Sequence, residues 1–356
     1  MAKAAVQPHT STIFDFFTVP TTESVDSCSM GADSITSVHS GRGANVVQQL
    51  ASAGEPGAGD NPGAGRRVRY LRNEAAPSAQ RMILGNTLRR QRTSLGMNQQ
   101  EAAYRLPGSS SKVSRIESGH HQFKEDDLAK FFRMYSITDP TEQERMLEVA
   151  AAANEPAWWQ PWSWAAPKFL QAVVSFEDMA TRMRSYEPLQ LHALIQTRAY
   201  SQAVIERGPG SRKERDALTE LREERKARFS LLPEGKRLIV IIDEVTLRRP
   251  VGSPSVMREQ LEHLLNLSDD PRYAFRLAEL GRYDLPVDLG PTTIFDFEGI
   301  LPTLVYAEGY DGGLIIQDEK DVDNRSKAFD ALRVASLAPH PTARKISDIL
   351  MRSYRR

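Results

Sequence analysis

Apolar residues recur at the spacing of a helix face from residue 83 onward. Leu84, Leu88 and Leu95 fall on one such face and are separated by arginines. Gly96 follows directly, and glycine is the residue that best adopts the left-handed conformation at a helix end. The pattern therefore predicts a helix over 83–95.

A second helix is predicted over Gln99 to Leu106. Asn98 stands before it and Glu101 three residues later, which is the spacing of a capping box. Ala102 and Ala103 face inward together with Leu106. Because alanine side chains are small, a neighbouring helix can approach this face closely.

A third helix follows a sharp break at Pro107-Gly108. Ser109 is expected to cap it, with Val113 and Ile116 facing inward. We expect Glu117 to pair with a nearby arginine, such as Arg89. The residues expected on the outer face are Ser110, Ser111, Lys112, Ser114 and Arg115.

Two further amphipathic helices complete a predicted five-helix bundle over residues 81–154. The first spans 125–135. The second spans 141–153 and is expected to begin at Thr141, with Glu144 three residues later. The inward residues of the first are Leu128, Phe131, Phe132 and Tyr135.

Residues 1–80 are rich in Ser, Gly, Ala and Pro, so we expect a disordered extension. Its pentapeptide TIFDF, at 12–16, recurs at 293–297. Either the repeat is coincidental, or the early copy docks where the later strand docks. Translation starting at Met82 is a third possibility, which would remove the extension.

Residues 155–168 contain all four tryptophans and three prolines, which disfavour a helix. We interpret the segment as a linker whose aromatic side chains pack on the following domain. The alternative is an exposed aromatic surface for a ligand or a partner.

Residues 169–356 alternate between helical and strand patterns. Helices are predicted at 169–185, 212–229, 254–267, 318–337 and 342–354. Strands are predicted at 238–242, 273–280, 292–297, 303–308 and 313–317. The expected fold class is α+β multidomain, with an all-α bundle followed by an α+β domain that has a mainly antiparallel sheet.

The formal net charge of the 356 residues is zero, which argues against a chain that coats nucleic acid along its length. Residues 81–135 nevertheless hold ten Lys and Arg against five Asp and Glu, so the positive charge is local. Cys28 is the only cysteine, and no apolar run could span a bilayer. We therefore expect a cytoplasmic, nucleoid-associated protein with no membrane contact.

The run NQQEAAYRLPGSSSKVSRIESG closely resembles the lambda-repressor-like, XRE-type helix-turn-helix domain. The resemblance covers about 84–135 and implies double-stranded DNA as a partner. It also implies that residues 109–115 enter the major groove and that Gln99 touches a phosphate. Pro107-Gly108 departs from the family, which more often has Gly and an apolar residue there.

The phrases YEPL…LIQTRAY, IIDEVTLRRPVGSPSVMREQLEHLL and LVYAEG resemble the C-terminal domain of unknown function attached to such regions in many actinobacterial regulators. The resemblance implies a region that senses a ligand or binds a small partner protein. The chain departs from relatives at His192-Ala193, where a Pro-Gly is usual, and in its long extension.

Polar side chains interrupt the apolar elements of this domain at strand ends. A ligand or partner would contact Tyr186, Glu187, Gln196, Glu244, Arg248 and Tyr306. Carboxylates such as Glu187, Glu244 and Glu308 could do acid–base chemistry. However, no phosphate loop, nucleophile elbow or histidine metal spacing accompanies them. We therefore expect no enzyme, cofactor or metal, and a buried Glu244–arginine pair.

The leading hypothesis is a homodimeric, sequence-specific transcription regulator that reads an operator in the major groove. The alternative is an antitoxin-like interaction switch in a two-gene module, in which DNA binding is secondary.

Overall fold

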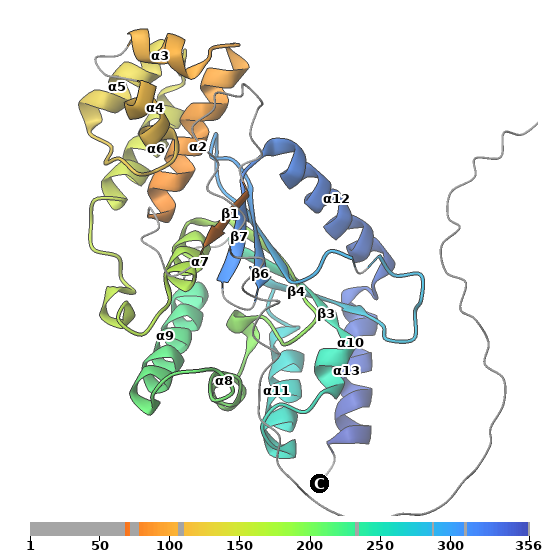
Figure 1. Cartoon of the computed structure of the whole chain (residues 1–356). Coiled ribbons are helices and arrows are strands. Elements are labelled where there is room, and N and C mark those ends of the chain that lie inside the picture. The colour runs from red at the N-terminus through yellow and green to blue at the C-terminus, as the bar shows by residue number, and fades with distance from the viewer. Residues whose placement is uncertain are drawn as a thin grey trace, which may run out of the picture. The chain divides into compact units, whose positions relative to one another are not determined.

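The structure is a computed structural model that describes residues 68–71, 78–105, 110–231, 235–286, 288–309 and 312–354. Figure 1 shows helices α2 to α6 grouped together. In the sequence these helices precede strands β2 to β7. Among the described residues, no helix has the length and apolarity that crossing a bilayer requires.

The predicted five-helix bundle is confirmed. Its apolar centre includes the expected Leu84, Leu88, Leu128 and Phe131, all almost completely buried, whereas Leu95 is 47% exposed at the end of the first helix. The five helices are α2 (Ala79–Ser94), α3 (Gln99–Arg105), α4 (Ser110–Glu117), α5 (Glu125–Met134) and α6 (Pro140–Ala152).

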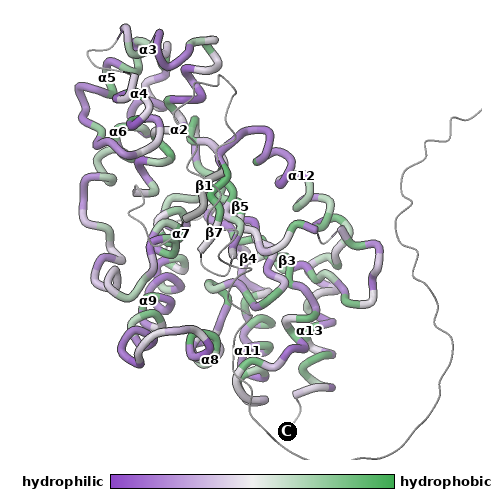
Figure 2. The backbone as a smooth tube through the Cα atoms, viewed as in Figure 1, coloured by the Kyte–Doolittle hydropathy of each residue, from purple (hydrophilic) through white to green (hydrophobic). Residues whose placement is uncertain are grey.

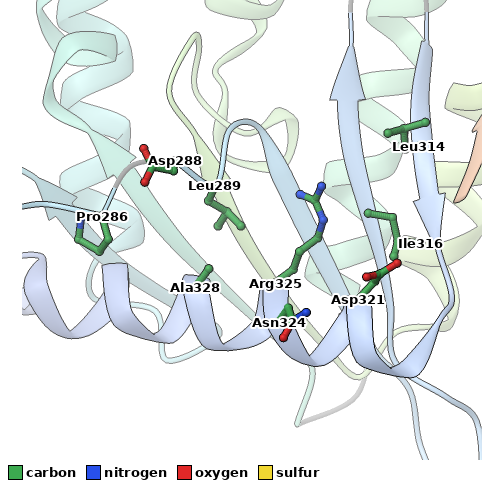
Figure 3. A pocket seen from close by; sticks show the side chains of 9 residues that line it. All are labelled: Pro286, Asp288, Leu289, Leu314, Ile316, Asp321, Asn324, Arg325 and Ala328. Atoms are coloured by element: carbon green, nitrogen blue, oxygen red, sulfur yellow. The ribbon is translucent and has the colours of Figure 1, made fainter. Parts of the chain in front are cut away.

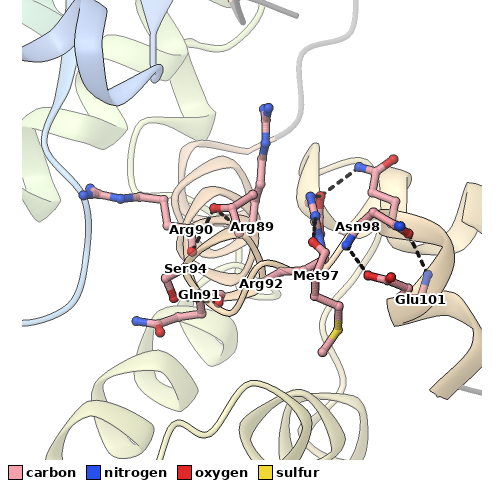
Figure 4. A network of polar contacts seen from close by, with 11 residues as sticks. Arg89, Arg90, Gln91, Arg92, Ser94, Met97, Asn98 and Glu101 are labelled. Atoms are coloured by element: carbon pink, nitrogen blue, oxygen red, sulfur yellow. Dashed lines mark hydrogen bonds and ion pairs between the residues drawn. The ribbon is translucent and has the colours of Figure 1, made fainter. Parts of the chain in front are cut away.

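Local side-chain caps fix the helix starts. The Asn98 and Glu101 capping box forms as predicted, with reciprocal bonds of 2.7 Å and 2.9 Å between backbone N–H and side-chain oxygen (Figure 4). The last helix differs, because Asp139 caps it and accepts from the Thr141 N–H at 2.8 Å. Pro140 then supplies the first helical residue, where the missing N–H costs nothing.

In the part of the chain that the structure describes, the strands form one seven-stranded sheet of order β1-β7-β6-β5-β2-β3-β4. The pairings β1–β7, β7–β6, β6–β5 and β5–β2 are antiparallel, and β2–β3 and β3–β4 are parallel. The sheet is thus mainly antiparallel, as predicted. Its strands are β1 (Val68–Leu71), β2 (Arg182–Glu187), β3 (Arg237–Asp243), β4 (Tyr273–Ala278), β5 (Thr292–Asp296), β6 (Leu304–Gly309) and β7 (Gly312–Ile316).

Helices occupy the connections of this sheet. The parallel pairs require crossovers, and α8–α9 and α10–α11 provide them. The helices are α7 (Lys168–Met179), α8 (Arg198–Ile205), α9 (Arg212–Leu231), α10 (Glu244–Arg248), α11 (Pro254–Leu267), α12 (Glu319–Ala335) and α13 (Pro339–Ser353), with short 3-10 turns η1 (Gln160–Trp162) and η2 (Ala193–Ile195).

Successive residues of β3 and β5 enter different apolar clusters on the two faces of the sheet. Val240 and Phe295 belong to the cluster that includes residues of α7, α11 and α13. Ile241 and Ile294, their neighbours in sequence, pack instead with Phe329 of α12. Figure 2 shows the resulting apolar strands between more polar helices.

The helix predicted over 169–185 is shorter than expected. α7 ends at Met179 and the chain becomes strand β2, in which Met183 and Ser185 are fully buried. Apolar spacing continued past the true end because β2 is a buried central strand, and such runs do not distinguish strand from helix.

The expected disordered extension lies mostly outside the described residues, but two parts of it do not. Val68–Leu71 forms the edge strand β1 on β7, and α2 already begins at Ala79. Composition could not predict β1, because its pairing partner lies more than 240 residues further along the chain. The early TIFDF copy is not described, and the later copy overlaps β5, which is paired on both edges.

The tryptophan segment packs on the helices that follow it. The Trp159 indole N–H donates to Ser175 Oγ at 2.9 Å, and the Arg228 guanidinium lies 4.6 Å from the Trp158 ring centre. Trp164 remains 53% exposed, with Lys213 Nζ 5.1 Å from its ring centre. Most of the segment therefore follows the packing interpretation.

Candidate functional site

Helix α4 has a polar face at the surface of the bundle and an apolar face that is buried. Val113 and Ile116 are buried, as the spacing predicts. The predicted outer residues that the structure describes are all at the surface: Ser110, Ser111 and Arg115 are exposed, and Lys112 and Ser114 are half-buried. Ser109 and Leu106 lie outside the described residues.

The charged groups of this surface lie close to one another. Lys112 Nζ is 3.9 Å from Asp127 Oδ1, a distance that leaves the ammonium only loosely engaged. The Arg115 side chain has no ion-pair partner among the described residues. His121 is near both cations: partial burial, followed by the charges of Lys112 and Arg115, lowers its pKa. The imidazole therefore remains neutral at neutral pH.

A buried ion pair holds the end of α4 against α2. Arg92 Nε and Nη2 donate to Glu117 at 2.5 Å and 3.0 Å, and both side chains are buried. Arg92 Nη1 also donates to the Met97 carbonyl at 2.5 Å. The prediction that Glu117 pairs with a nearby arginine is thus confirmed, but the partner is Arg92 and not Arg89.

Gln99, for which phosphate contact is predicted, also contacts Glu117. Its Nε2 donates to Glu117 Oε2 at 2.8 Å, so the amide joins the frame that holds α4. The Gln99 side chain is half-buried, and its phosphate contact stays a prediction. Figure 4 shows the surrounding polar network at the end of α2 and the start of α3.

Gly85 allows α2 and α4 to approach closely. A Cβ at this position would lie 2.5 Å from the Ile116 carbonyl oxygen and 2.7 Å from that of Glu117. Since both atoms belong to the backbone, neither could move away alone. We did not single out Gly85 from the sequence, although a glycine inside a helical pattern indicates a close packing partner.

The six residues expected around a ligand do not form one cluster. Glu187 and Tyr306 line a common cavity, and Gln196 reaches that cavity through Arg222, whose Nη1 donates to its Oε1 at 2.8 Å. Tyr186 points to the other face of the sheet and donates to Asp243 Oδ2 at 2.9 Å. Adjacent strand residues face opposite sides, which is why Tyr186 and Glu187 separate.

Glu244 and Arg248 lie in α10, away from that cavity. Glu244 is 3% exposed and accepts from Arg248 Nε at 2.7 Å and from the Leu280 N–H at 3.1 Å. The ammonium nitrogen Nζ of Lys345, in α13, lies 3.7 Å from Glu244 Oε2. The expected buried Glu244–arginine pair is therefore present, and it ties α10 to its neighbours.

The strand register explains why Glu187 and Glu308 meet. Tyr186 pairs with Thr292, and Thr292 pairs with Ala307. Glu187 and Glu308 each follow by one residue, so both lie at the same end of the sheet. The sequence separation of these strands hid this proximity.

The cavity has a volume of about 80 Å³ and lies among α7, α9, β2 and β6. The lining residues are Phe169, Leu170, Val173, Glu177, Glu187, Gln190, Leu191, His192, Ala193, Arg222, Arg225, Thr293, Tyr306 and Glu308. Burial, followed by the charge of Glu308, raises the pKa of Glu187 well above its usual value, although the Ser185 hydroxyl opposes the shift.

A larger cavity of about 520 Å³ opens between α12, β7 and the loop before β5 (Figure 3). Its walls include Leu289, Ile316 and Ala328, with Arg325 extending from the helix. None of the six expected ligand residues lines it. Its polar lining residues Asp288, Asp321, Asn324 and Arg325 are exposed or half-buried, unlike the buried Glu187 of the smaller cavity.

The described residues contain no cluster of three or more His, Cys, Asp or Glu side chains suited to a metal ion.

Residues 83–146 match the model of a helix-turn-helix domain, and residues 170–348 match the family model "Domain of unknown function (DUF5753)". No curated protein and no solved structure matches the chain. The second match spans half of the chain, which therefore belongs to the DUF5753 family and carries a helix-turn-helix domain of DNA-binding regulators before it.

Proposed function

We propose that the chain is a sequence-specific transcription regulator of the XRE type, in which α4 enters the major groove of an operator. The observation that carries this proposal is the α4 surface, where serines, Lys112 and Arg115 stand on a rigidly held helix. Hydroxyls and basic side chains at the start of such a helix reach base edges and phosphates. We propose no catalytic step.

Two copies would act together. The readout set is small and built largely of serines, so one copy offers few strong contacts. A homodimer would place two α4 helices in successive major grooves, about 34–36 Å apart, and would favour a palindromic operator.

The C-terminal domain would report a ligand or a small partner protein to the DNA-binding helices. Its buried polar cavity supports the ligand version. The exposed Trp164 favours a second candidate, an antitoxin-like interaction switch in which DNA binding is secondary. Co-purification of the full-length protein with a stoichiometric small protein, lost in Trp164→Ala, would support this alternative.

Genome-wide footprinting of the full-length protein, followed by binding measurements on the recovered sites, tests the main proposal. Lys112→Ala/Arg115→Ala should abolish specific protection. Arg198→Ala/Arg212→Ala removes the same charge from exposed positions outside the bundle and should leave protection intact. Protection of the same sites by the first double variant would refute the assignment of α4.

A further inference from the structure

The 80 Å³ cavity combines a charged end with an apolar wall. Glu187, Glu308 and Arg222 lie at the charged end, and Phe169 and Val173 contribute to the wall. An apolar cavity of ~150 Å³ holds benzene. A cavity about half that size has room for the charged group of a ligand and its first few carbon atoms.

Of the two cations that line the cavity, Arg225 has a carboxylate partner and Arg222 has a neutral amide partner. Arg225 binds Glu177 through two bonds of 2.6 Å and 2.9 Å, and both side chains are buried. Arg222 donates to Gln196 Oε1 at 2.8 Å. Burial, followed by the charge of Arg225, lowers the pKa of Arg222 to about 10, so the guanidinium keeps its charge at neutral pH.

His192 adds no positive charge. Its Nδ1 accepts from the Leu194 N–H at 3.3 Å, which places the ring proton of the neutral form on Nε2. Burial lowers the pKa of His192 to about 4. The lining thus has three carboxylates, Glu177, Glu187 and Glu308, against two guanidinium groups.

Among the described lining residues, Glu187 is the buried carboxylate without an ion pair, since Glu177 binds Arg225 and Glu308, which also has no ion pair, is exposed. Glu187 is 9% exposed, and its carboxylate has no ion-pair partner among the described residues. Oε1 accepts one bond of 3.1 Å from the Ser185 hydroxyl. A buried carboxylate in this setting gains most from a ligand that brings a positive charge and several N–H donors.

We propose that this cavity binds the ammonium group of a small aliphatic amine, with Glu187 as the main acceptor and Glu308 at the mouth. The alkyl part would lie against Phe169, Leu170 and Val173. A primary ammonium supplies three donors, enough to bond both carboxylates at once. The identification of this amine as the effector rests on the proposed function, whereas binding itself does not.

The site also couples binding to a proton. In the empty cavity Glu187 holds a proton to a higher pH than an ordinary carboxyl, facing Glu308 of β6, Arg222 and Arg225 of α9, Glu177 of α7 and His192. An ammonium ligand requires the ionised carboxylate, so binding expels that proton. Affinity should therefore rise with pH until Glu187 is ionised without the ligand.

Calorimetric titration of the full-length protein with n-butylammonium tests the site. We expect saturable binding, with no binding of n-butanol or butyrate. Glu187→Gln should weaken it roughly ten- to hundredfold, because a charged hydrogen bond is replaced by a neutral one. Glu206→Gln, an exposed carboxylate outside the cavity, should bind like the unaltered protein.

Val173→Phe provides a second variant, which fills the apolar wall and leaves both carboxylates in place. Urea unfolding shows whether each variant is folded. Equal binding of n-butanol and n-butylammonium, or undiminished binding by folded Glu187→Gln, would overturn the proposal, as would absence of binding. Amine binding that leaves operator affinity unchanged would support the site and count against its role as a sensor, while operator protection tests the α4 assignment independently.

Discussion

The guanidinium of Arg92 and the carboxylate of Glu117 form a two-bond ion pair, 2.5 Å and 3.0 Å long, inside the helical bundle. The pair joins the last turn of α2 to the last turn of α4. Gln99 adds a third bond to the same carboxylate. The orientation of the outward helix is thereby fixed from its C-terminal end, while its N-terminal residues are left at the surface.

Removing one partner of this pair should strongly destabilise the bundle. Arg92→Met leaves the Glu117 carboxylate buried without a counter-ion, and we expect a loss of about 3–5 kcal/mol. Urea unfolding followed by circular dichroism measures it. Arg92→Met/Glu117→Leu should recover part of the loss, since no buried charge then remains.

The control for that experiment is Arg90→Gln. Arg90 pairs with Glu319, but the two side chains are 42% and 77% exposed. An exposed pair contributes at most about 1 kcal/mol. A loss in Arg92→Met no larger than in Arg90→Gln would show that the buried pair does not hold α4.

Gly85→Ala should destabilise the protein although alanine is the better helix former. The new methyl group would overlap backbone oxygens of Ile116 and Glu117, so α4 must shift. We expect a cost of about 1–3 kcal/mol and weaker operator binding. Gly281→Ala is the matched control, because a Cβ there meets nothing within 4 Å. Thermal unfolding that ranks the two variants equally would contradict the close approach of α2 and α4.

Lys112 and Arg115 should affect DNA binding in different ways. Lys112→Gln removes a flexible charge, so it should weaken binding to all sequences and reduce the slope of log affinity against log salt by ~0.9. Arg115→Gln should relax base preference at one operator position, by about 1–3 kcal/mol. Salt titrations on the operator and on single-base variants check both. Identical effects of the two changes would show that Arg115 contacts phosphate only.

His192 should make folding stability fall at acid pH. Its pKa is 6.5 in an unfolded chain and about 4 in the fold, so the unfolded state binds the proton between these values. The contribution should be lost as pH falls from 6.5, reaching roughly 3 kcal/mol below pH 4. His192→Asn can keep the bond to the Leu194 N–H and cannot titrate.

The measurement is the difference in unfolding free energy between the His192→Asn and unaltered proteins at several pH values. The difference also cancels the opposite trend of Glu187, whose raised pKa makes folding less favourable as pH rises. A difference that stays constant from pH 7 to about 4 would contradict the buried neutral imidazole.

The helical bundle could be predicted from the sequence because its determinants are local. Asn98 and Glu101 are three residues apart, and their mutual bonds need nothing else. The burial of Arg92 could also be predicted, because Arg92 follows Leu88 by four residues and therefore lies on the same buried face of the helix. We expected Arg89 because both arginines lie in the same helix and charge alone does not separate them.

The cavity could not be predicted in the same way. Glu187 and Glu308 meet only through the register of three strands, and no sequence pattern specifies which strands are neighbours. The apolar spacing over 169–185 predicts a helix that includes the first residues of β2, so it does not predict the strand alternation that separates Tyr186 from Glu187. The sequence indicates that these polar residues stand at strand ends, but which of them meet depends on the order of the strands in the sheet.

The order of the strands determines what removal of the N-terminal residues does to the sheet. β1 precedes the helix-turn-helix in the sequence, whereas its partner β7 follows it, so the DNA-binding helices are an insertion within the sheet domain. A chain beginning at Met82 would lack β1 and the Ser78 cap of α2. The backbone of β7 would then be an open edge, available to a strand from another molecule. Removing residues from the N-terminus would thus change self-association at a site more than 200 residues away in the sequence.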